Sequence, residues 1–230
     1  MRRLLFTTGS PFARAVRIVL DELELDYERQ EEITTPSAQQ RAAATPTLQV
    51  PTLWDGDITL WESGTIVEYL LSTYRGRSSG TPPMADFAFR ATHEWRDKLV
   101  FSTIQTFGTA ATTISQLKWS GVSIADNAHL QRSAEKLTYI LDWLEAQFED
   151  NGEGLLPGCV SMQDIFLAVH VRFVQARPLG IDLPMAKFER ISALLQRLDE
   201  RPSFRSNPIW WWEPGVVGYE ADGKPIYKKP

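Results

Sequence analysis

The chain is poor in cysteine and histidine. Cys159 is the one cysteine among 230 residues, which excludes an internal disulfide, a Cys-x-x-Cys redox pair and a cysteine-rich metal site. The three histidines, His93, His129 and His170, lie far apart and show no ligand spacing such as His-Glu-x-x-His. We therefore expect no bound metal, and redox thiol chemistry would have to borrow a thiol from a ligand.

The chain also lacks long apolar runs and an excess of basic residues. No run approaches the roughly 20 apolar residues that span a bilayer, and the early charges do not fit a secretory signal. The formal net charge is −5 and the isoelectric point is about 5.3, which argues against a general affinity for nucleic acid or anionic membranes. These features predict a cytoplasmic protein that binds neither nucleic acid nor membrane.

The composition is that of a globular protein, with 43% hydrophobic and 23% charged residues. Its length suits two domains. A run rich in Gly, Ser and Pro, Arg75–Met84, is typical of a linker. We place a first domain at residues 1–77, the linker at 78–85, a helical domain at 86–206 and an irregular, Trp-rich tail at 207–230.

The first domain begins with a predicted strand, helix and strand. The strand is short and apolar over Arg2–Thr8, and the helix follows with Ser10 as its N-cap and Pro11 at its first position. A second, edge-like strand is predicted over Asp26–Ile33. Prolines, threonines and alanines then indicate a loop with at most a short helix at Ala38–Ala44.

A hairpin and a second helix complete the first domain. The pair Asp55-Gly56 separates two apolar runs, and both of its positions favour the positive φ of a tight turn. The following helix begins near Ser63 and ends near Arg75-Gly76.

The second domain is predicted to be helical throughout. The expected helices lie near 85–118, 124–149, 161–177 and 186–200. Ser161-x-x-Asp164 heads an apolar run as a capping-box-like start, and His170 within that helix fits a packed core position. The run Trp210-Trp211-Trp212 either packs on its own helical domain or folds over a cleft as an apolar lid.

This order of elements is that of a thioredoxin-like α/β domain joined to an all-α helical bundle. The chain resembles the glutathione transferase superfamily, as a serine-type, bacterial-like member. Four stretches carry the resemblance: SPFARAVRIVL at 10–20, ATPTLQVPTL at 44–53, LWESGTIVEYL at 60–70 and SMQDIFLAVH at 161–170. It implies a homodimer that uses glutathione as co-substrate, without a metal, in detoxification.

The stretch Gln49-Val50-Pro51 is implied to hold two parts of glutathione. In the family this proline is cis, and the backbone of the residue before it pairs with the cysteinyl part, here Val50. Gln49 stands where relatives place lysine or glutamine against the glycyl end. Relatives often have Asn-Pro-x-Gly-Lys-Val-Pro, whereas residues 45–51 are Thr-Pro-Thr-Leu-Gln-Val-Pro. Arg41 either supplies a charge there or is solvated, and Pro51 alone would also fit a proline that opens a strand.

The pair Glu62-Ser63 is implied to hold the γ-glutamyl end of glutathione. A helix start offers unpaired N–H groups and a positive dipole end to the carboxylate, and Glu62 faces the ammonium. The alternative is a helix cap beside a solvated acid.

Ser10 is implied to donate a hydrogen bond to the glutathione thiolate. Relatives with cysteine here form mixed disulfides and act as reductases, so serine disfavours that chemistry. The alternative is that Ser10 only caps its helix through the N–H of Phe12 or Ala13, which is compatible with donation because a hydroxyl donates once and accepts twice. Thr7 or Thr8 remains a possible donor in its place.

The resemblance implies attack of the activated thiolate on a hydrophobic electrophile in a pocket of apolar side chains. Phe101, Phe107, Thr113 and Trp119 lie on the helix that forms one wall of that pocket in relatives, but such aromatic series are usually core. Two alternatives stay open: a non-catalytic binding or scaffold protein with this fold, and a glutathione-dependent isomerase or peroxidase.

Overall fold

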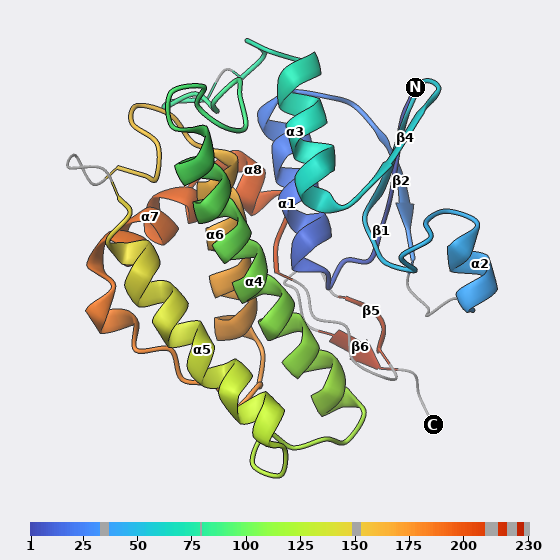
Figure 1. Cartoon of the computed structure of the whole chain (residues 1–230). Helices are drawn as coiled ribbons and strands as arrows, with labels where there is room; N and C mark the ends of the chain where they lie inside the picture. Colours follow the sequence, from blue (N-terminus) through green and yellow to red (C-terminus); the bar gives the residue numbers. More distant parts are fainter. Residues whose placement is uncertain (33–36, 79, 149–152, 210–215, 220–224, 228–230) are drawn as a thin grey trace.

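The computed structural model describes residues 1–32, 37–78, 80–148, 153–209, 216–219 and 225–227. The first domain is a four-stranded mixed sheet with helices, as predicted. Its elements are β1 (Arg2–Phe6), α1 (Pro11–Glu22), β2 (Glu28–Glu31), α2 (Ala38–Ala42), β3 (Thr52–Asp55), β4 (Ile58–Trp61) and α3 (Ser63–Thr73). The strand order is β2-β1-β3-β4; β1 and β2 are parallel and the other pairs antiparallel. In Figure 1, α1 and α3 lie between this sheet and the helical domain.

Local sequence signals explain the hairpin and α1. Asp55 pairs with Ile58, so the turn consists of Gly56 and Asp57, and Gly56 has the positive φ of 60° that glycine adopts without a steric cost. The Ser10 side chain caps α1, and Pro11 occupies its first turn. The predicted hairpin and the predicted start of α1 are confirmed, but the turn lies one residue later than the predicted Asp55-Gly56, and of these two residues Gly56 alone has a positive φ.

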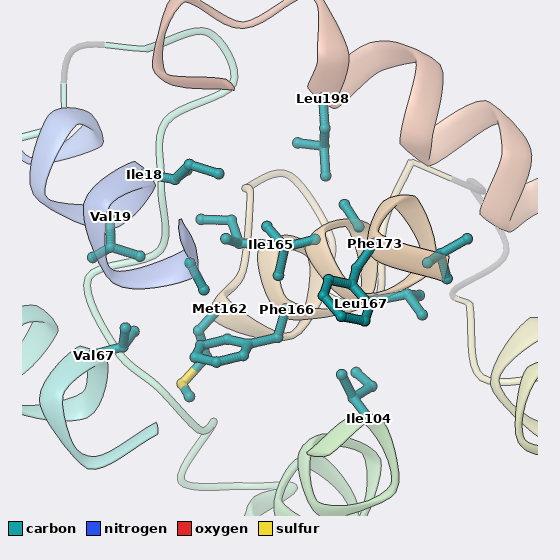
Figure 2. Close-up of a cluster of buried hydrophobic side chains, with 14 of the residues drawn as sticks. Ile18, Val19, Val67, Ile104, Met162, Ile165, Phe166, Leu167, Phe173 and Leu198 are labelled. Atoms are coloured by element: carbon teal, nitrogen blue, oxygen red, sulfur yellow. The ribbon is translucent and has the colours of Figure 1, made fainter. Parts of the chain in front are cut away.

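The helical domain is built around one largely buried helix, α6 (Met162–Ala176). Its elements are α4 (Glu94–Trp119), α5 (Ala128–Glu145), α6 (Met162–Ala176), a 3-10 turn η1 (Met185–Lys187), α7 (Glu189–Asp199) and α8 (Pro202–Arg205). Nearly every α6 side chain is buried. Figure 2 shows Phe166 and Phe173 of α6 among side chains of the surrounding helices, with Ile18 of α1, Ile104 of α4 and Leu198 of α7 close by. A helix that is apolar on all sides needs such cover on all sides.

Two differences from the sequence predictions stand out, beside α5, which is four residues shorter at each end than the predicted 124–149. The helix expected from residue 85 begins at Glu94. Ala85 donates to the Val160 carbonyl (2.8 Å) and Val160 to the Pro83 carbonyl (2.9 Å), which holds residues 83–85 extended, and bends and turns follow as far as residue 93. The tail expected to be irregular contains an antiparallel strand pair, β5 (Val216–Tyr219) and β6 (Pro225–Tyr227). These strands are rich in β-branched and aromatic residues, which favour strands. The three tryptophans at 210–212 lie outside the described residues.

The capping box at the start of α6 is buried. Ser161 Oγ accepts from the Asp164 N–H, and Asp164 accepts from the Ser161 N–H (2.8 Å), the Ser161 hydroxyl (2.6 Å) and the Leu155 N–H (2.9 Å). Burial raises the pKa of the Asp164 carboxyl, and these hydrogen bonds lower it. One carboxylate therefore satisfies three donors in the core.

A buried ion pair joins the two domains. Glu22, at the end of α1, accepts two N–H groups of Arg201 at 2.8 and 2.6 Å and the hydroxyl of Ser203 on α8. Arg14 of α1 donates from Nε to the Asn207 carbonyl at 2.7 Å. The α1 helix thus lies against the sheet on one side and contacts α6 and α8 on the other. None of the described helices has the length and apolar character that a bilayer crossing requires.

His170 is a packed core residue, as predicted. Its ring is 0% exposed, 4.8 Å from the Phe12 ring and 5.9 Å from the Phe166 ring, and Nε2 lies 3.4 Å from Gln105 Oε1. Burial lowers the pKa of His170 to about 3, whereas an unfolded histidine titrates at about 6.5. The imidazole is therefore neutral in the folded protein at neutral pH.

This pKa difference predicts acid sensitivity. From about pH 6.5 down to about pH 3 the unfolded chain binds a proton at His170 that the folded chain does not, so the free energy of unfolding falls with pH, at most by about 1.4 kcal/mol per unit. We expect the stability advantage of wild type over His170→Gln to shrink by about 2 to 3 kcal/mol between about pH 7 and about pH 4. Urea unfolding at each pH measures it. His129→Gln, at an exposed histidine, is the control. If the free energy of unfolding had the same pH dependence in wild type and in His170→Gln, the prediction would be contradicted.

Candidate functional site

A cavity of about 520 Å³ lies at the junction of the two domains. On one side its walls are the loop before α1, the loop before β3 and the turn from β4 to α3; on the other they are α4 and the end of α6. All of the residues predicted to bind glutathione line this cavity: Ser10, Gln49, Val50, Pro51, Glu62 and Ser63. The fold brings them together from three separate segments.

Ser10 caps α1 and lines the cavity at once. Its Oγ accepts a hydrogen bond from the Ala13 N–H at 3.2 Å, and the residue is half-buried. That bond uses a lone pair, so the hydroxyl hydrogen can point elsewhere. Thr7 also lines the cavity, whereas Thr8 is not among the described lining residues. The N-terminus of α1 thus places a hydroxyl donor and a positive dipole end on the cavity wall.

The turn between β4 and α3 presents Glu62 and Ser63 side by side. Glu62 is exposed, precedes the helix with φ 65° and ψ 111°, and makes no capping bond with its side chain. A positive φ at a non-glycine residue costs about 1 to 3 kcal/mol and is concentrated at functional sites. Ser63 is buried and is the first residue of α3, so its backbone N–H belongs to the unpaired group at the helix start. The alternative that Ser63 is the helix cap does not hold.

The loop before β3 supplies the third group. Gln49 is exposed, Val50 half-buried and Pro51 buried, and the peptide bond between Val50 and Pro51 is cis. Arg41 of α2 also lines the cavity; it is 8% exposed and forms an ion pair with Glu32. The alternative of a solvated arginine is therefore wrong. Arg41 Nη1 is buried and has no hydrogen-bond partner among the described residues.

The α4 wall of the cavity carries several polar side chains beside Trp119, which the expectation of an apolar pocket did not include. Its lining residues include Gln105, Thr109, Thr112, Thr113 and Gln116. Residues three and four apart share one face of a helix, so this spacing in the sequence was a signal for a polar stripe. Thr113 and Trp119 line the cavity, whereas Phe107 lies in the core and Phe101 packs against Phe166.

Arg177, just after α6, is a lining residue that the sequence analysis missed. It is 6% exposed and donates from Nη2 to the Gly9 carbonyl at 2.8 Å. Its guanidinium carbon lies 4.3 Å from the centre of the Phe173 ring and 5.2 Å from that of Trp119. These contacts fix a positive charge beside the loop that carries Ser10.

The described lining of the cavity includes no thiol of the chain itself. Cys159 lines a different cavity, near Arg201 and Pro202, and burial raises the pKa of its thiol to about 11. It is therefore protonated at neutral pH and a poor nucleophile. Among the described residues, no group of His, Cys, Asp and Glu side chains is arranged to hold a metal ion.

Fold and cavity together define a class: a two-domain protein with a thioredoxin-like half and a helical half that share one cavity. Family models of the glutathione S-transferase N-terminal domain and C-terminal domain match residues 4–78 and 127–197. The two matches together span more than half of the chain. The chain belongs to the glutathione S-transferase superfamily.

Known relatives agree with this assignment. The chain is 39% identical over 69 residues to glutathione S-transferase-like protein gedE of Aspergillus terreus, and equally to tpcF of Aspergillus fumigatus. These matches cover 29% of the chain and only 30% and 31% of the two proteins.

Solved structures share the whole fold. A glutathione S-transferase of Methylobacterium radiotolerans in complex with glutathione sulfonate has a TM-score of 0.74 at 20% identity, over 96% of this chain and 99% of that one. One from Methylobacillus flagellatus with GSH bound has a TM-score of 0.73 at 18% identity, over 90% and 98%. At these identities the likeness establishes the fold.

Proposed function

We propose that the chain is a serine-type glutathione transferase, in which Ser10 donates a hydrogen bond to the thiolate of bound glutathione. The thiolate attacks an electrophilic carbon of a small molecule: a carbon–sulfur bond forms, the leaving group departs with its electron pair, and the thiol proton goes to solvent. The observation that carries this proposal is the convergence of Ser10, Val50 and Ser63, from three segments, on one cavity.

The energetics are sufficient. A free thiol has a pKa of about 8.5, and lowering it by about two units requires about 2.7 kcal/mol. A hydrogen bond to a charged acceptor supplies about 1.5 to 3 kcal/mol. The N-terminus of α1 adds about 0.3 to 1 kcal/mol. Ser10 and α1 together therefore account for a thiolate at neutral pH.

The other residues are assigned to the rest of the tripeptide. The Val50 backbone pairs with the cysteinyl part, and Ser63 and the start of α3 hold the γ-glutamyl carboxylate while Glu62 faces the ammonium. Gln49 contacts the glycyl end. Arg41 supplies the cation for the glycyl carboxylate, because its buried, unpartnered Nη1 belongs to a lining residue.

A titration of bound glutathione tests the proposed function. We expect the pKa of its thiol, followed by thiolate absorbance with the protein in excess, to fall by about one to two units. The protein should also bind a glutathione column. Binding with an unshifted thiol pKa would contradict catalysis and favour the non-catalytic scaffold. A shifted pKa with turnover of peroxides or isomerisable substrates alone would favour the other enzymatic alternative.

We also propose that the chain forms a homodimer. Large apolar side chains are exposed on α4 and α5, where Trp95 is 80%, Leu99 56% and Tyr139 72% exposed. Trp95 and Leu99 lie one turn apart on the same face of α4. Such exposed apolar surface on a folded chain is typical of an interface.

Size-exclusion chromatography with light scattering measures the mass of the protein in solution and so tests the homodimer. Wild type should elute at twice the chain mass, and the double variant Trp95→Lys, Leu99→Lys should shift to the monomer, since two like charges on one helix face cannot be desolvated without partners. Glu200→Lys, an exposed site after α7, is the control. A monomeric wild type would refute the proposal.

A further inference from the structure

One residue of the helical domain contacts the turn that carries Ser10. We propose that Arg177, just after α6, is a positioning residue for the reaction: it holds the turn before α1 in the orientation in which the Ser10 hydroxyl faces the glutathione sulfur. The inference rests on the proposed function, because it concerns the donor to the thiolate. The helical domain then sets the geometry of a group that the first domain carries.

The first argument is the place of the contact. Arg177 is 6% exposed, and its Nη2 donates to the Gly9 carbonyl at 2.8 Å. That carbonyl and the Ser10 N–H belong to one planar peptide group. The Ser10 N–H in turn donates to the Thr7 carbonyl at 3.1 Å, which closes the turn. A hydrogen bond that fixes the Gly9 carbonyl therefore fixes the direction in which the chain enters Ser10.

The second argument is that this turn needs an anchor from outside. Gly9 has no Cβ, so several orientations of its backbone have similar free energies. The bond from the Ala13 N–H to Ser10 Oγ, at 3.2 Å, ties the side chain to α1 but not the peptide group before it. A displacement of about 1 Å at a reacting group can lower a rate about 100-fold. Loss of the Arg177 contact should therefore affect the chemistry as well as the stability.

The third argument is that Arg177 is itself fixed by two helices. Its guanidinium carbon lies 4.3 Å from the centre of the Phe173 ring on α6 and 5.2 Å from that of Trp119 on α4. Its Nη1 lies 3.5 Å from the hydroxyl oxygen of Ser115, also on α4. A stacked, planar guanidinium is preorganised and loses little freedom in each hydrogen bond. One side chain thus connects α4, α6 and the turn before α1.

A double-mutant cycle separates positioning from a direct effect of the arginine's charge on the sulfur. We expect Arg177→Met to raise the thiol pKa of bound glutathione by about one unit and to lower kcat/KM for an aryl chloride at least about tenfold. In a Ser10→Ala background the same change should shift the pKa by less than about 0.3 unit, because no hydroxyl is left to position. Equal shifts in both backgrounds would assign the effect to the charge and overturn the inference.

A second variant keeps the charge and loosens its support. Phe173→Leu removes the ring on which the guanidinium stacks, so the thiol pKa should rise in the same direction by a smaller amount. If Arg177→Met does not fold, this variant decides, and an unchanged pKa would overturn the inference. Arg190→Met is the control. The Arg190 guanidinium also holds a backbone carbonyl, that of Phe148 at 3.2 Å, and neither residue is among the described lining residues of the cavity.

Hydrogen exchange of the free protein tests the anchor without glutathione. The Ala13 N–H, which Ser10 caps, should exchange at least about threefold faster in Arg177→Met than in wild type. The Leu130 N–H, which Asn127 caps at the start of α5, is the internal reference. Unchanged exchange at Ala13 would overturn the inference. If wild type leaves the thiol pKa of glutathione unshifted while the variant speeds exchange at Ala13, the proposed function fails and the anchor stands, so the two failures are distinct.

Discussion

Ser10→Ala should lower kcat/KM for conjugation about 100-fold at neutral pH, because the hydrogen bond to the thiolate contributes more to the proposed activation than the helix end does. The pKa of bound glutathione should rise toward that of the free thiol. Glutathione affinity should change much less, since the other contacts remain. Steady-state kinetics with an aryl chloride and the thiolate titration give the two values.

The structure adds a stability effect to this prediction. Ser10 also caps α1 through the Ala13 N–H, so the variant should lose about 1 kcal/mol of unfolding free energy. Asn127→Ala removes a comparable cap from α5, far from the cavity, and should lose similar stability with unchanged kinetics. Unchanged turnover in Ser10→Ala would move the donor role to Thr7, and Thr7→Val would then be the variant to measure.

Asp164→Ala should be the most destabilising single change, with a loss of about 3 kcal/mol. It leaves three buried donors on Leu155 and Ser161 without an acceptor, and each costs about 1 to 3 kcal/mol. Relief of the carboxylate's own desolvation, which raises its pKa, offsets part of this. Urea denaturation measures the change in the free energy of unfolding. Because α6 lies at the centre of the helical domain, we expect the loss to destabilise that whole domain.

The chain contains its own control for this prediction. Ser37 and Gln40 form the same reciprocal capping box at the exposed start of α2. There water replaces a lost partner, so Gln40→Ala should cost less than about 1 kcal/mol. Equal losses at Gln40 and Asp164 would mean that burial does not set the cost. Asp164→Asn, which keeps one carbonyl acceptor, should recover part of the stability.

Features encoded within a few residues were predictable. The turn at Gly56 depends on one positive φ, and the start of α1 on the adjacent Ser10 and Pro11. The capping box of α6 likewise needs only Ser161 and Asp164, three residues apart. The residues proposed to bind glutathione came from motifs in a resemblance, and the structure places them on one cavity.

Features that depend on contacts between distant segments of the chain could not be predicted from the sequence. The predicted start of α4 at residue 85 fails because Ala85 pairs with Val160, far along the chain. The propensity of residues 85–93 gives no hint of that partner. Arginine is usually solvated, so only tertiary packing reveals that Arg41 and Arg177 are buried at the cavity. The spacing of the polar residues in the sequence indicates that they share one face of α4. The packing of α4 against α6 decides which face meets the cleft.

The bidentate pair between Glu22 and Arg201, together with the Arg14 contact to Asn207, makes the two halves of the molecule one mechanical unit. These contacts restrain the two walls of the cleft relative to each other before a ligand binds. Less of a ligand's binding free energy then goes into positioning the walls, and more of it remains for orienting sulfur and acceptor.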